Sequence, residues 1–387
     1  MRLLSVISST DPLGGGPIEG VLQSAPFLSD LGADMEIVSC DSPDAAWLIS
    51  CGVRVHALGP GFLKYGYTSR LVPWLRANAA SYDAVIIHGI WQYHSFATWL
   101  ALRGTGVPYF VFTHGMLSPW FKHEYPLKHL KKWTYWPWAD YRVLRDARAV
   151  LFTSDEERMR ARQSFWLYRA TEVVTSYGTA SPRVADTAEL LRNWPALEGK
   201  RIVLFLSRIH AVKGCDILLD AFARVAGVDD RLHLIVAGPD QTGLMTSLVA
   251  RAKDLGIDGR VTWLGMLQGE AKWAAFQSAE VFCLPSHQEN FGVVVAEALG
   301  SGKPVLISNK VNIWRDIESE GAGFVDDDTV EGTERNLRRW LAMDVRGHTA
   351  MAARARACFQ SHFEIRDAVE RLLEIVGGSR PGSDAGE

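Results

Sequence analysis

Three things are scarce in this 387-residue sequence: cysteine, long uncharged stretches, and an excess of charge of either sign. The five cysteines are widely spaced and include no C-x-x-C pair: Cys40, Cys51, Cys215, Cys283 and Cys358. That set excludes a disulfide framework and a cysteine-based zinc site, and it is typical of a reducing, intracellular environment. The net charge of −3 argues against a protein built mainly to coat nucleic acid, so no nucleic-acid partner is expected.

One uncharged stretch needs a membrane check. Residues 84–102 contain no Asp, Glu, Lys or Arg over 19 positions. Within them a β-type run gives way to a helical one, so we interpret the stretch as strand, loop and helix rather than as a membrane span. The apolar run at residues 3–7 is too short for a signal-peptide core and is interpreted as a first strand. We therefore expect a cytoplasmic protein.

The chain does contain enough apolar residues for two domains. It is 48% hydrophobic and 22% charged, and its length suits two domains of about 150–200 residues each. Short apolar runs alternate with amphipathic segments, which is the pattern of βα units around parallel sheets. In the first half we predict strands at Leu3–Ile7, Met35–Ser39, Val53–Leu58, Ala84–His88, Tyr109–Thr113, Val150–Thr153 and Glu172–Thr175. In the second half we predict them at Arg201–Ser207, Leu232–Ala237, Val261–Leu264, Val281–Leu284, Val305–Ser308 and Gly323–Val325.

The polar, proline-bearing segment Gly178–Lys200 separates the two series and suits a domain boundary. Because strands this apolar are usually covered on both faces, we predict an α/β protein with two doubly wound parallel sheets. The predicted divisions are residues 1–180, 181–363 and 364–387. In such sheets ligands bind beyond the carboxyl ends of the strands, so the residues just after each strand are the candidates for a site.

The first candidate is the loop Asp11–Pro17, directly after the first strand. Its three consecutive glycines let the main chain approach a ligand, and Pro17 suits the first turn of a helix whose free N–H groups could bind an anion. The dinucleotide fingerprint G-x-G-x-x-G fails because Gly20 comes one residue late, and no Walker lysine follows. A tight β–α turn without a ligand is the alternative.

The second candidate is a pair of cations after the strand Arg201–Ser207. The guanidinium of Arg208 and the ammonium of Lys213 could both reach a diphosphate, the first as a fork and the second as a point charge. Two solvated charges on a loop are the alternative, and the position at the carboxyl end of a strand disfavours it.

The third candidate is a pair of carboxylates after the strand Val281–Leu284. Glu289 lies before a helix that starts near Gly292, and Glu297 lies inside that helix among Val, Ala and Leu. A carboxylate is costly to bury without hydrogen-bond donors, and sugar hydroxyls are such donors. A capping Glu289 with an exposed Glu297 is the alternative.

Glu289 and Glu297 form an E-x7-E motif, and with it the chain resembles the family 4 (group 1) retaining glycosyltransferases, which have the GT-B fold of two Rossmann-like domains facing across a cleft. The resemblance covers nearly the whole chain. Segments that are similar to members acting in bacterial surface-polysaccharide assembly are Gly15-Gly16, Val85–Trp91 and Thr113–Trp120. Further segments that fit the family's order are Ser154–Glu157, Gly238–Asp240 and Lys303–Val305. One departure is Ser176-Tyr177-Gly178, where the family usually has Pro-Asn-Gly, so the contacts of that loop stay open.

The resemblance implies a nucleotide-diphosphate sugar, UDP- or GDP-linked, as donor. Its diphosphate would contact Arg208 and Lys213, with Gly15 and Gly16 approaching from the N-terminal domain. Its ribose hydroxyls would contact Glu297, and its hexose Glu289 and the amides of Asn290, Phe291 and Gly292. Base selection is expected at the main chain near Gly238 and Leu264. His114 would lie under the sugar near the reaction centre, with a buried structural histidine as the alternative.

The resemblance further implies transfer with retention and no cofactor or metal, with fixed cations stabilising the leaving phosphate. The acidic run Asp326–Asp328 is interpreted as a solvated loop rather than a metal-binding D-x-D. Residues 364–376 would form a helix that returns to the N-terminal domain. The acceptor would be polyprenyl-linked or an oligosaccharide in exopolysaccharide or lipopolysaccharide assembly.

The last feature is a basic aromatic stretch. Residues 120–148 contain seven Lys or Arg against three Asp or Glu, and eight aromatic residues. The residues Lys128, Lys131, Lys132 and Trp133 fall within about one and a half helical turns, which suits an anionic membrane surface on the inner face of the cell membrane. A helical hairpin that packs its aromatic residues inside the domain is the alternative.

Three other functions have to be weighed. A sugar-nucleotide epimerase can share the two-domain architecture, but it would act without an acceptor. A non-catalytic carbohydrate- or membrane-binding protein would have little need of Glu289, Glu297, Arg208 and Lys213 together. A Rossmann oxidoreductase is disfavoured because the fingerprint spacing fails.

Overall fold

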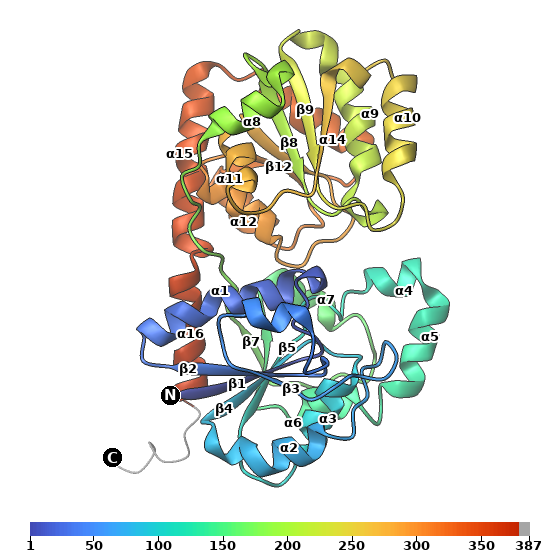
Figure 1. Cartoon of the computed structure of the whole chain (residues 1–387). Helices are drawn as coiled ribbons and strands as arrows, with labels where there is room; N and C mark the ends of the chain where they lie inside the picture. The colour runs from blue at the N-terminus through green and yellow to red at the C-terminus, as the bar shows by residue number, and fades with distance from the viewer. Residues whose placement is uncertain (379–387) are drawn as a thin grey trace. The chain divides into compact units, whose positions relative to one another are not determined.

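A computed structural model of the chain describes residues 1–378. These divide into two compact units, one formed by residues 1–179 together with the chain from Ile365 onward, the other by Ala180–Glu364 (Figure 1). The divisions expected from the sequence, after residues 180 and 363, lie one residue from the structural ones. Each unit is described by itself below.

The first unit is built on a seven-stranded parallel sheet of order β3-β2-β1-β4-β5-β6-β7. Its strands are β1 (Arg2–Ile7), β2 (Asp34–Ser39), β3 (Val55–Ala57), β4 (Ala84–His88), β5 (Tyr109–Phe112), β6 (Ala149–Phe152) and β7 (Glu172–Val174). Its helices are α1 (Gly16–Asp30), α2 (Leu71–Asn78), α3 (Tyr93–Leu102), α4 (Trp120–Glu124), α5 (Pro126–Tyr135), α6 (Asp140–Asp146), α7 (Asp155–Ala161) and α16 (Ile365–Gly377). The order steps outward in both directions from β1 and β4, as in a doubly wound sheet.

Helices cover both faces of this sheet. On one face α1 packs on β2 over Ile7, Ile18, Val21 and Ile37, and α16 packs against α1. On the other face α2, α3 and α6 enclose the larger core, which includes the fully buried strand residues Val85, Ile87 and Val111 (Figure 1). The helix α16 is the last one described and belongs to the first unit, and residues 379–387 lie outside the described part.

The second unit has a six-stranded parallel sheet of order β10-β9-β8-β11-β12-β13. Its strands are β8 (Arg201–Leu206), β9 (Leu232–Ala237), β10 (Val261–Gly265), β11 (Val281–Leu284), β12 (Val305–Ser308) and β13 (Gly323–Asp326). Its helices are α8 (Thr187–Asn193), α9 (Cys215–Val225), α10 (Met245–Asp254), α11 (Gly269–Ser278), α12 (Val293–Gly300), α13 (Trp314–Ser319), α14 (Val330–Leu341) and α15 (Val345–His362). Contacts of α9 with α10 and α14 cover one face, and those of α12 with α15 and of α8 with α11 cover the other.

The predicted fold class is confirmed. Each strand expected from the sequence is present, and the bounds differ by two residues at most. The uncharged stretch at residues 84–102 forms β4, a loop and α3, as expected. Among residues 1–378, no helix has both the length and the apolar character that crossing a membrane requires.

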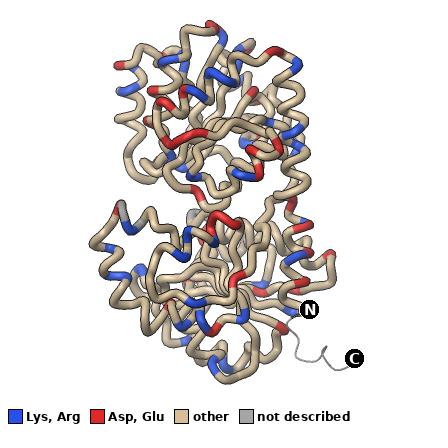
Figure 2. The backbone as a smooth tube through the Cα atoms, turned by 180° about the vertical axis from the view of Figure 1, so that it is seen from behind, with Lys and Arg blue, Asp and Glu red and all other residues tan. Residues whose placement is uncertain are grey.

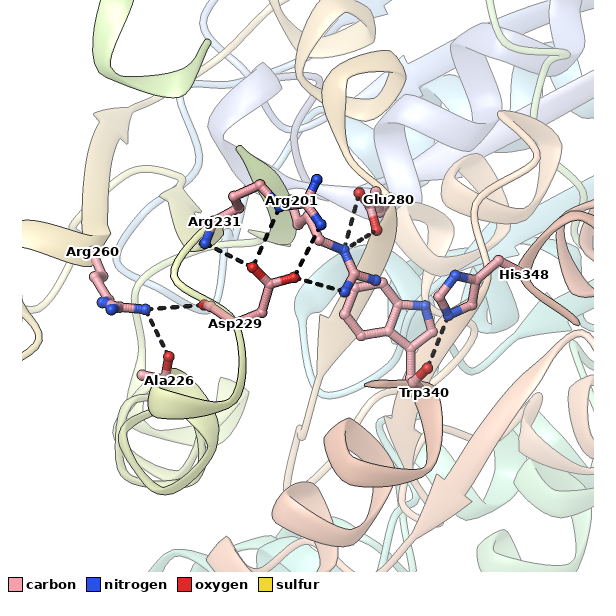
Figure 3. A network of polar contacts seen from close by, with 8 residues as sticks. All are labelled: Arg201, Ala226, Asp229, Arg231, Arg260, Glu280, Trp340 and His348. Atoms are coloured by element: carbon pink, nitrogen blue, oxygen red, sulfur yellow. Dashed lines mark hydrogen bonds and ion pairs between the residues drawn. The ribbon is translucent and has the colours of Figure 1, made fainter. Parts of the chain in front are cut away.

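Polar contacts hold the amino ends of the strands in the second unit (Figure 3). Arg201, the first residue of β8, donates to Asp229 over 3.1 Å and to Glu280 over 3.1 Å, and its guanidinium lies 5.0 Å from the ring centroid of Trp340. Arg260 donates to the main-chain oxygens of Ala226 and Asp229. These contacts fasten the amino ends of four strands, β8 to β11, and the helix α14 together at the end of the sheet opposite to the one where ligands bind.

Positions of Lys and Arg and positions of Asp and Glu are both distributed along the chain in each unit (Figure 2). The five cysteines are all buried and free, so no disulfide contributes to either core. Stability of each unit therefore rests on apolar burial and on local polar contacts such as those of Arg201.

Candidate functional site

The second unit brings Lys213 and Glu289 together. A short 3-10 turn, Ala211–Lys213, follows β8, and Gly214 then adopts a left-handed conformation with φ 68° before α9 begins. A β-carbon at Gly214 would overlap the carbonyl oxygen of Pro285, so only glycine lets the start of α9 approach the loop after β11 this closely. This approach places the Lys213 ammonium in an ion pair with the Glu289 carboxylate.

Both members of this pair are held in place. Lys213 is only 5% exposed. The main-chain N–H of Glu289 donates to the carbonyl oxygen of Lys310 over 3.1 Å, and the carbonyl oxygen of Glu289 accepts from the main-chain N–H of Asn312 over 3.1 Å. These bonds tie the loop after β11 to the loop after β12. A buried ammonium needs an anion beside it, and Glu289 supplies one. The pair is thus a fixed polar centre at the carboxyl ends of β8 and β11.

Arg208 adds a second cation to this centre. Its side chain is exposed, and within residues 1–378 its guanidinium makes no hydrogen bond or ion pair. Burial lowers the pKa of the neighbouring His210, and the positive charges of Arg208 and Lys213 lower it further. The local potential is therefore positive, and the Arg208 fork remains available to an anion.

The start of α12 carries the remaining predicted hexose contacts. Gly292 is the residue that caps this helix, and Phe291 is 4% exposed and packs edge-on against Phe363, with ring centroids 5.7 Å apart. Asn290 accepts a hydrogen bond from the amide of Asn312 over 3.3 Å. The Phe291 ring thus anchors the loop in the core, while the first N–H groups of α12 lie beside Glu289.

Glu297 is buried within α12, as its apolar neighbours predicted. It is 3% exposed, and its carboxylate accepts from the Lys272 ammonium of α11 over 2.6 Å. Lys272 also lies 4.7 Å from the ring centroid of Trp273. The protein therefore supplies a donor for this carboxylate, and the sequence analysis missed Lys272 because no local pattern links it to Glu297.

The positions expected to select the base lie at the ends of β9 and β10. The main-chain N–H of Gly238 donates to the carbonyl oxygen of Gly265 over 2.7 Å. Leu264 is 9% exposed, so its side chain belongs to the core. Next to Gly238, four consecutive main-chain N–H groups after Gln241 donate to the Asp240 carboxylate and lower its pKa.

The acidic run Asp326–Asp328 is engaged with side chains of the unit. Asp326 pairs with Arg335 over 2.9 Å, Asp327 accepts from Asn309 over 2.7 Å, and Asp328 lies 2.7 Å from the Nδ1 atom of His287. Within the described chain, no group of three or more His, Cys, Asp or Glu side chains is placed to hold a metal ion.

In the first unit, His114 lies at the carboxyl end of β5 in a left-handed conformation, with φ 48°. Such a backbone is costly for a residue with a β-carbon, so the surrounding structure has to impose it. The Glu157 carboxylate imposes it by accepting four hydrogen bonds. The Thr113 hydroxyl donates over 2.8 Å and the Gly115 N–H over 2.6 Å, and the N–H and hydroxyl of Thr153 each donate over 2.8 Å. Glu157 is 3% exposed and joins the ends of β5 and β6 on either side of His114.

Three aromatic rings lie against His114, those of His88, Phe112 and Tyr177. His88, the last residue of β4, lies with its Nδ1 atom 3.2 Å from the Nε2 atom of His114. Tyr177, in the segment that departs from the family pattern, contacts His114 edge-on at a centroid distance of 5.3 Å. The Tyr177 hydroxyl donates to the carbonyl oxygen of Pro17 over 2.9 Å. Tyr177 thus links the start of α1 to the His114 ring, a role that the sequence left open.

The glycine loop follows β1 at the same end of this sheet. Gly15 has φ 80° and stands directly before α1, and a β-carbon at Gly15 or Gly16 would meet no atom within 4 Å. The main chain is therefore accessible at both residues. The carboxylate of Asp41 accepts from the hydroxyl and N–H of Thr10 over 2.8 and 2.7 Å, which fixes the start of this loop.

The basic aromatic stretch divides into an inner and an outer face. Trp133 packs against Phe165 at a centroid distance of 5.0 Å, and the Lys132 ammonium lies 4.3 Å from the ring centroid of Trp91. On the outer face of α5, Leu127 and Leu130 are 82% and 65% exposed. Lys128 and Lys131 are exposed beside them. Internal packing therefore describes the inner face of α5, and the membrane surface stays a prediction for its exposed outer face.

Comparison with known proteins assigns the family. The profile described as glycosyl transferase 4-like domain matches residues 15–178, and the profile described as glycosyl transferases group 1 matches residues 186–357. A D-inositol 3-phosphate glycosyltransferase of Mycobacterium leprae is 30% identical over 328 residues, which are 76% of this chain and 71% of that protein. The chain belongs to the group 1 glycosyltransferases.

Solved structures agree with this glycosyltransferase fold. A sucrose-phosphate synthase from Thermosynechococcus elongatus matches with a TM-score of 0.79 and 19% identity, over 97% of this chain and 98% of its own. HepE of Anabaena, in complex with UDP and glucose, matches with a TM-score of 0.77 and 20% identity, over 98% of this chain and 100% of its own.

The predicted site residues of this glycosyltransferase divide between its two units. Gly15, Gly16 and His114 lie at strand ends of the first unit. The other predicted donor contacts lie at strand ends of the second unit, except Glu297, which lies inside α12. Four residues that hold the predicted residues in place were not predicted from the sequence as parts of the site: Glu157, His88, Asp41 and Lys272. Only Glu157 had a local signal, because Ser154 and Glu157 have the S-x-x-E spacing of a capping box and the Ser154 hydroxyl accepts from the Glu157 N–H over 3.1 Å.

Proposed function

We propose that this glycosyltransferase moves a hexose, with retention, from a UDP- or GDP-linked sugar to an acceptor. The observation that carries the proposal is the pairing of Lys213 with Glu289 beside Arg208, which has no bonded partner among residues 1–378. Two cations suit a diphosphate, and a carboxylate next to them suits the hydroxyls of the attached sugar. In support, the HepE structure contains UDP and glucose, as its description states.

The residues also suggest how the leaving group would be stabilised. As the sugar–phosphate bond breaks, negative charge develops on the diphosphate, and the cations of Arg208 and Lys213 would stabilise that charge. We propose that they take the place of a metal ion, that attack occurs on the face from which the phosphate leaves, and that this phosphate accepts the acceptor's proton. Asp326–Asp328 are engaged elsewhere and are not proposed as metal ligands.

A binding screen tests the donor. Purified protein is heated with UDP, GDP and their sugars, and a nucleotide that binds the folded state raises the melting temperature by mass action. We expect one base to stabilise the protein and Arg208→Ala to abolish that shift. Stabilisation by neither base would contradict the proposal. Product analysis without an acceptor then tests the alternative, because an epimerase would still interconvert the donor.

For the acceptor we propose a polyprenyl-linked or oligosaccharide substrate of bacterial surface-polysaccharide assembly, bound at the inner face of the cell membrane. The support is the outer face of α5, where Leu127 and Leu130 are exposed beside Lys128 and Lys131. Exposed leucines flanked by lysines suit an anionic lipid surface. Since Lys132 and Trp133 lie on the inner face of α5, they would support this surface rather than form it.

Co-sedimentation with liposomes containing phosphatidylglycerol tests this surface. The double variants Leu127→Ser/Leu130→Ser and Lys128→Ala/Lys131→Ala should each bind less, and added salt should weaken the wild type. The matched control is Lys253→Ala, which removes an exposed cation from α10. Equal binding by all variants would overturn the membrane proposal.

A second acceptor class is a small phosphorylated polyol or sugar. The observation in its favour is that the M. leprae relative is described as a D-inositol 3-phosphate glycosyltransferase. Incubation of the enzyme and its donor with myo-inositol phosphate, and separately with a polyprenyl-diphosphate sugar, distinguishes the two classes by the product formed.

A further inference from the structure

A pair of buried histidines in the first unit bears on what His114 can do. The Nδ1 atom of His88 and the Nε2 atom of His114 share one hydrogen bond of 3.2 Å, and the two rings are stacked with centroids 5.4 Å apart. Burial lowers the pKa of His114 to about 3 and that of His88 well below its usual value. Both rings are therefore neutral near pH 7, so one must donate the hydrogen bond and the other must accept it.

The other nitrogen of His88 decides between the two arrangements. Its Nε2 atom is buried and has no hydrogen-bond partner within residues 1–378. If His114 donated, this Nε2 would have to carry a hydrogen with no acceptor, which is rare in folded proteins. The stacked ring of Phe112, inclined by 12° to that of His88, does not offer its π face to an in-plane N–H. If His88 donates instead, Nε2 carries only a lone pair, which can lie against C–H groups.

The neighbouring His94 has the same arrangement of one donating nitrogen and one unpartnered nitrogen. Its Nε2 atom lies 2.9 Å from the carbonyl oxygen of His88, so this nitrogen has to be the donor. The Nδ1 atom of His94 is consequently a lone pair, and it too is buried without a partner. This part of the core thus already accommodates an unpartnered imidazole lone pair.

We propose that His88 donates to His114 and thereby holds it as the neutral tautomer with its hydrogen on Nδ1. Nδ1 of His114 is neither hydrogen-bonded nor enclosed among the described residues. His114 therefore offers a ligand an N–H donor rather than a lone pair. It binds an oxygen and does not act as a general base, and His88 is its positioning residue. This inference deepens the proposed function, on which the ligand at His114 depends.

Long-range ¹H–¹⁵N spectra of the full chain with ¹⁵N-labelled histidine at pH 7 test the tautomer directly. The His114 signals, assigned by their loss in His114→Gln, should show a protonated Nδ1 and an unprotonated Nε2. His88→Asn keeps a donor near the Nδ1 position and should preserve this pattern, whereas His88→Leu should shift the hydrogen of His114 towards Nε2. His233→Leu, at a buried histidine of β9, is the matched control and should leave His114 unchanged.

A His114 protonated at Nε2 in the wild type would overturn the proposal, and so would a His88→Leu variant whose His114 keeps Nδ1–H entirely. With the donor found by the binding screen, His88→Leu should lower kcat about tenfold, the equivalent of one hydrogen bond, and leave KM within about twofold. His88→Asn should recover most of kcat. If no transfer occurs at all, the proposed function fails while the tautomer result stands. If transfer occurs with the opposite tautomer, only this inference fails.

Discussion

The two units build their candidate sites from different materials. In the second unit, charged side chains meet in pairs, Lys213 with Glu289 and Lys272 with Glu297. In the first, neutral histidines stack on one another, and the one carboxylate that holds them, Glu157, is bonded to main chain and hydroxyl groups. The charged pairs of the second unit suit a strongly charged ligand. The neutral histidines of the first unit suit an uncharged ligand whose oxygens need hydrogen-bond donors. This difference is in line with the proposal that the second unit binds the nucleotide diphosphate.

The second unit offers an internal comparison as well, because β8 has an arginine at each end. Arg201 at the amino end is bonded to Asp229 and Glu280 (Figure 3), whereas Arg208 beyond the carboxyl end has no bonded partner in the described chain. One side chain is satisfied within the fold, and the other remains available to bind a ligand.

The largest expected effect tests the difference between Arg208 and Arg201. Arg208→Ala should lower kcat/KM about 10²–10³-fold with little change in melting temperature, because it removes a fixed cation from the developing phosphate charge. Arg201→Ala should do the reverse, with a loss of stability of about 1–3 kcal/mol and nearly normal turnover. Steady-state kinetics and thermal unfolding of both variants measure this. Equal losses of activity would remove the distinction between the two ends of β8.

The next effect concerns the carboxylate of the first unit. In Glu157→Gln, an amide NH₂ group would face donors that now share one carboxylate oxygen, so we expect a loss of about 2–4 kcal/mol in unfolding free energy and a lower kcat. The control is Asp155→Asn in the same helical turn, whose 64% exposed side chain pairs with Arg158 at the surface and should matter by less than about 1 kcal/mol. Matching denaturant midpoints for the two variants would show that Glu157 does not hold the His114 loop.

The sequence was sufficient to predict the fold and to propose charged candidates in the second unit. Buried parallel strands are near-continuous apolar runs, so each could be located, and residues just after them, such as Arg208 and Glu289, became candidates by position alone. The supporting partners could not be found in this way. His88 meets His114 because β4 and β5 pair in the sheet, and Lys272 meets Glu297 because the fold brings α11 and α12, which flank β11 in the chain, into contact. The division of α5 into two faces likewise depends on what Phe165 and Trp91 cover.

A smaller effect follows from the histidines through pH. Their pKa values in the folded first unit, about 3 for His114, about 4 for His94 and well below normal for His88, lie under the usual value of about 6.5. The unfolded chain therefore binds more protons in this window, and stability falls as pH drops from about 6.5 towards 4. Asp140, whose pKa burial raises to about 7, acts in the opposite direction, but it is one group against three.

Hydrogen exchange at pH 7 and pH 5 should consequently show protection lost in peptides of the first unit before those of the second. His94→Gln should reduce this pH dependence by removing one of the three titrating groups. If both units lose protection together, these three histidines do not make the first unit more sensitive to acid than the second, where burial lowers the pKa of His233 to about 4.

The smallest expected effect is that of removing divalent metals. If Arg208 and Lys213 carry the charge that a metal would otherwise supply, then EDTA should leave turnover unchanged, because covalently attached cations cannot be chelated. The Arg208→Ala variant gives a stricter test of metal independence, because added Mg²⁺ or Mn²⁺ should restore little of its activity. The described residues of the unit include no cluster of three acidic or histidine ligands that could hold such an ion. Loss of wild-type turnover in EDTA with recovery on Mn²⁺ would mean that the charged half of the site is incomplete without a metal.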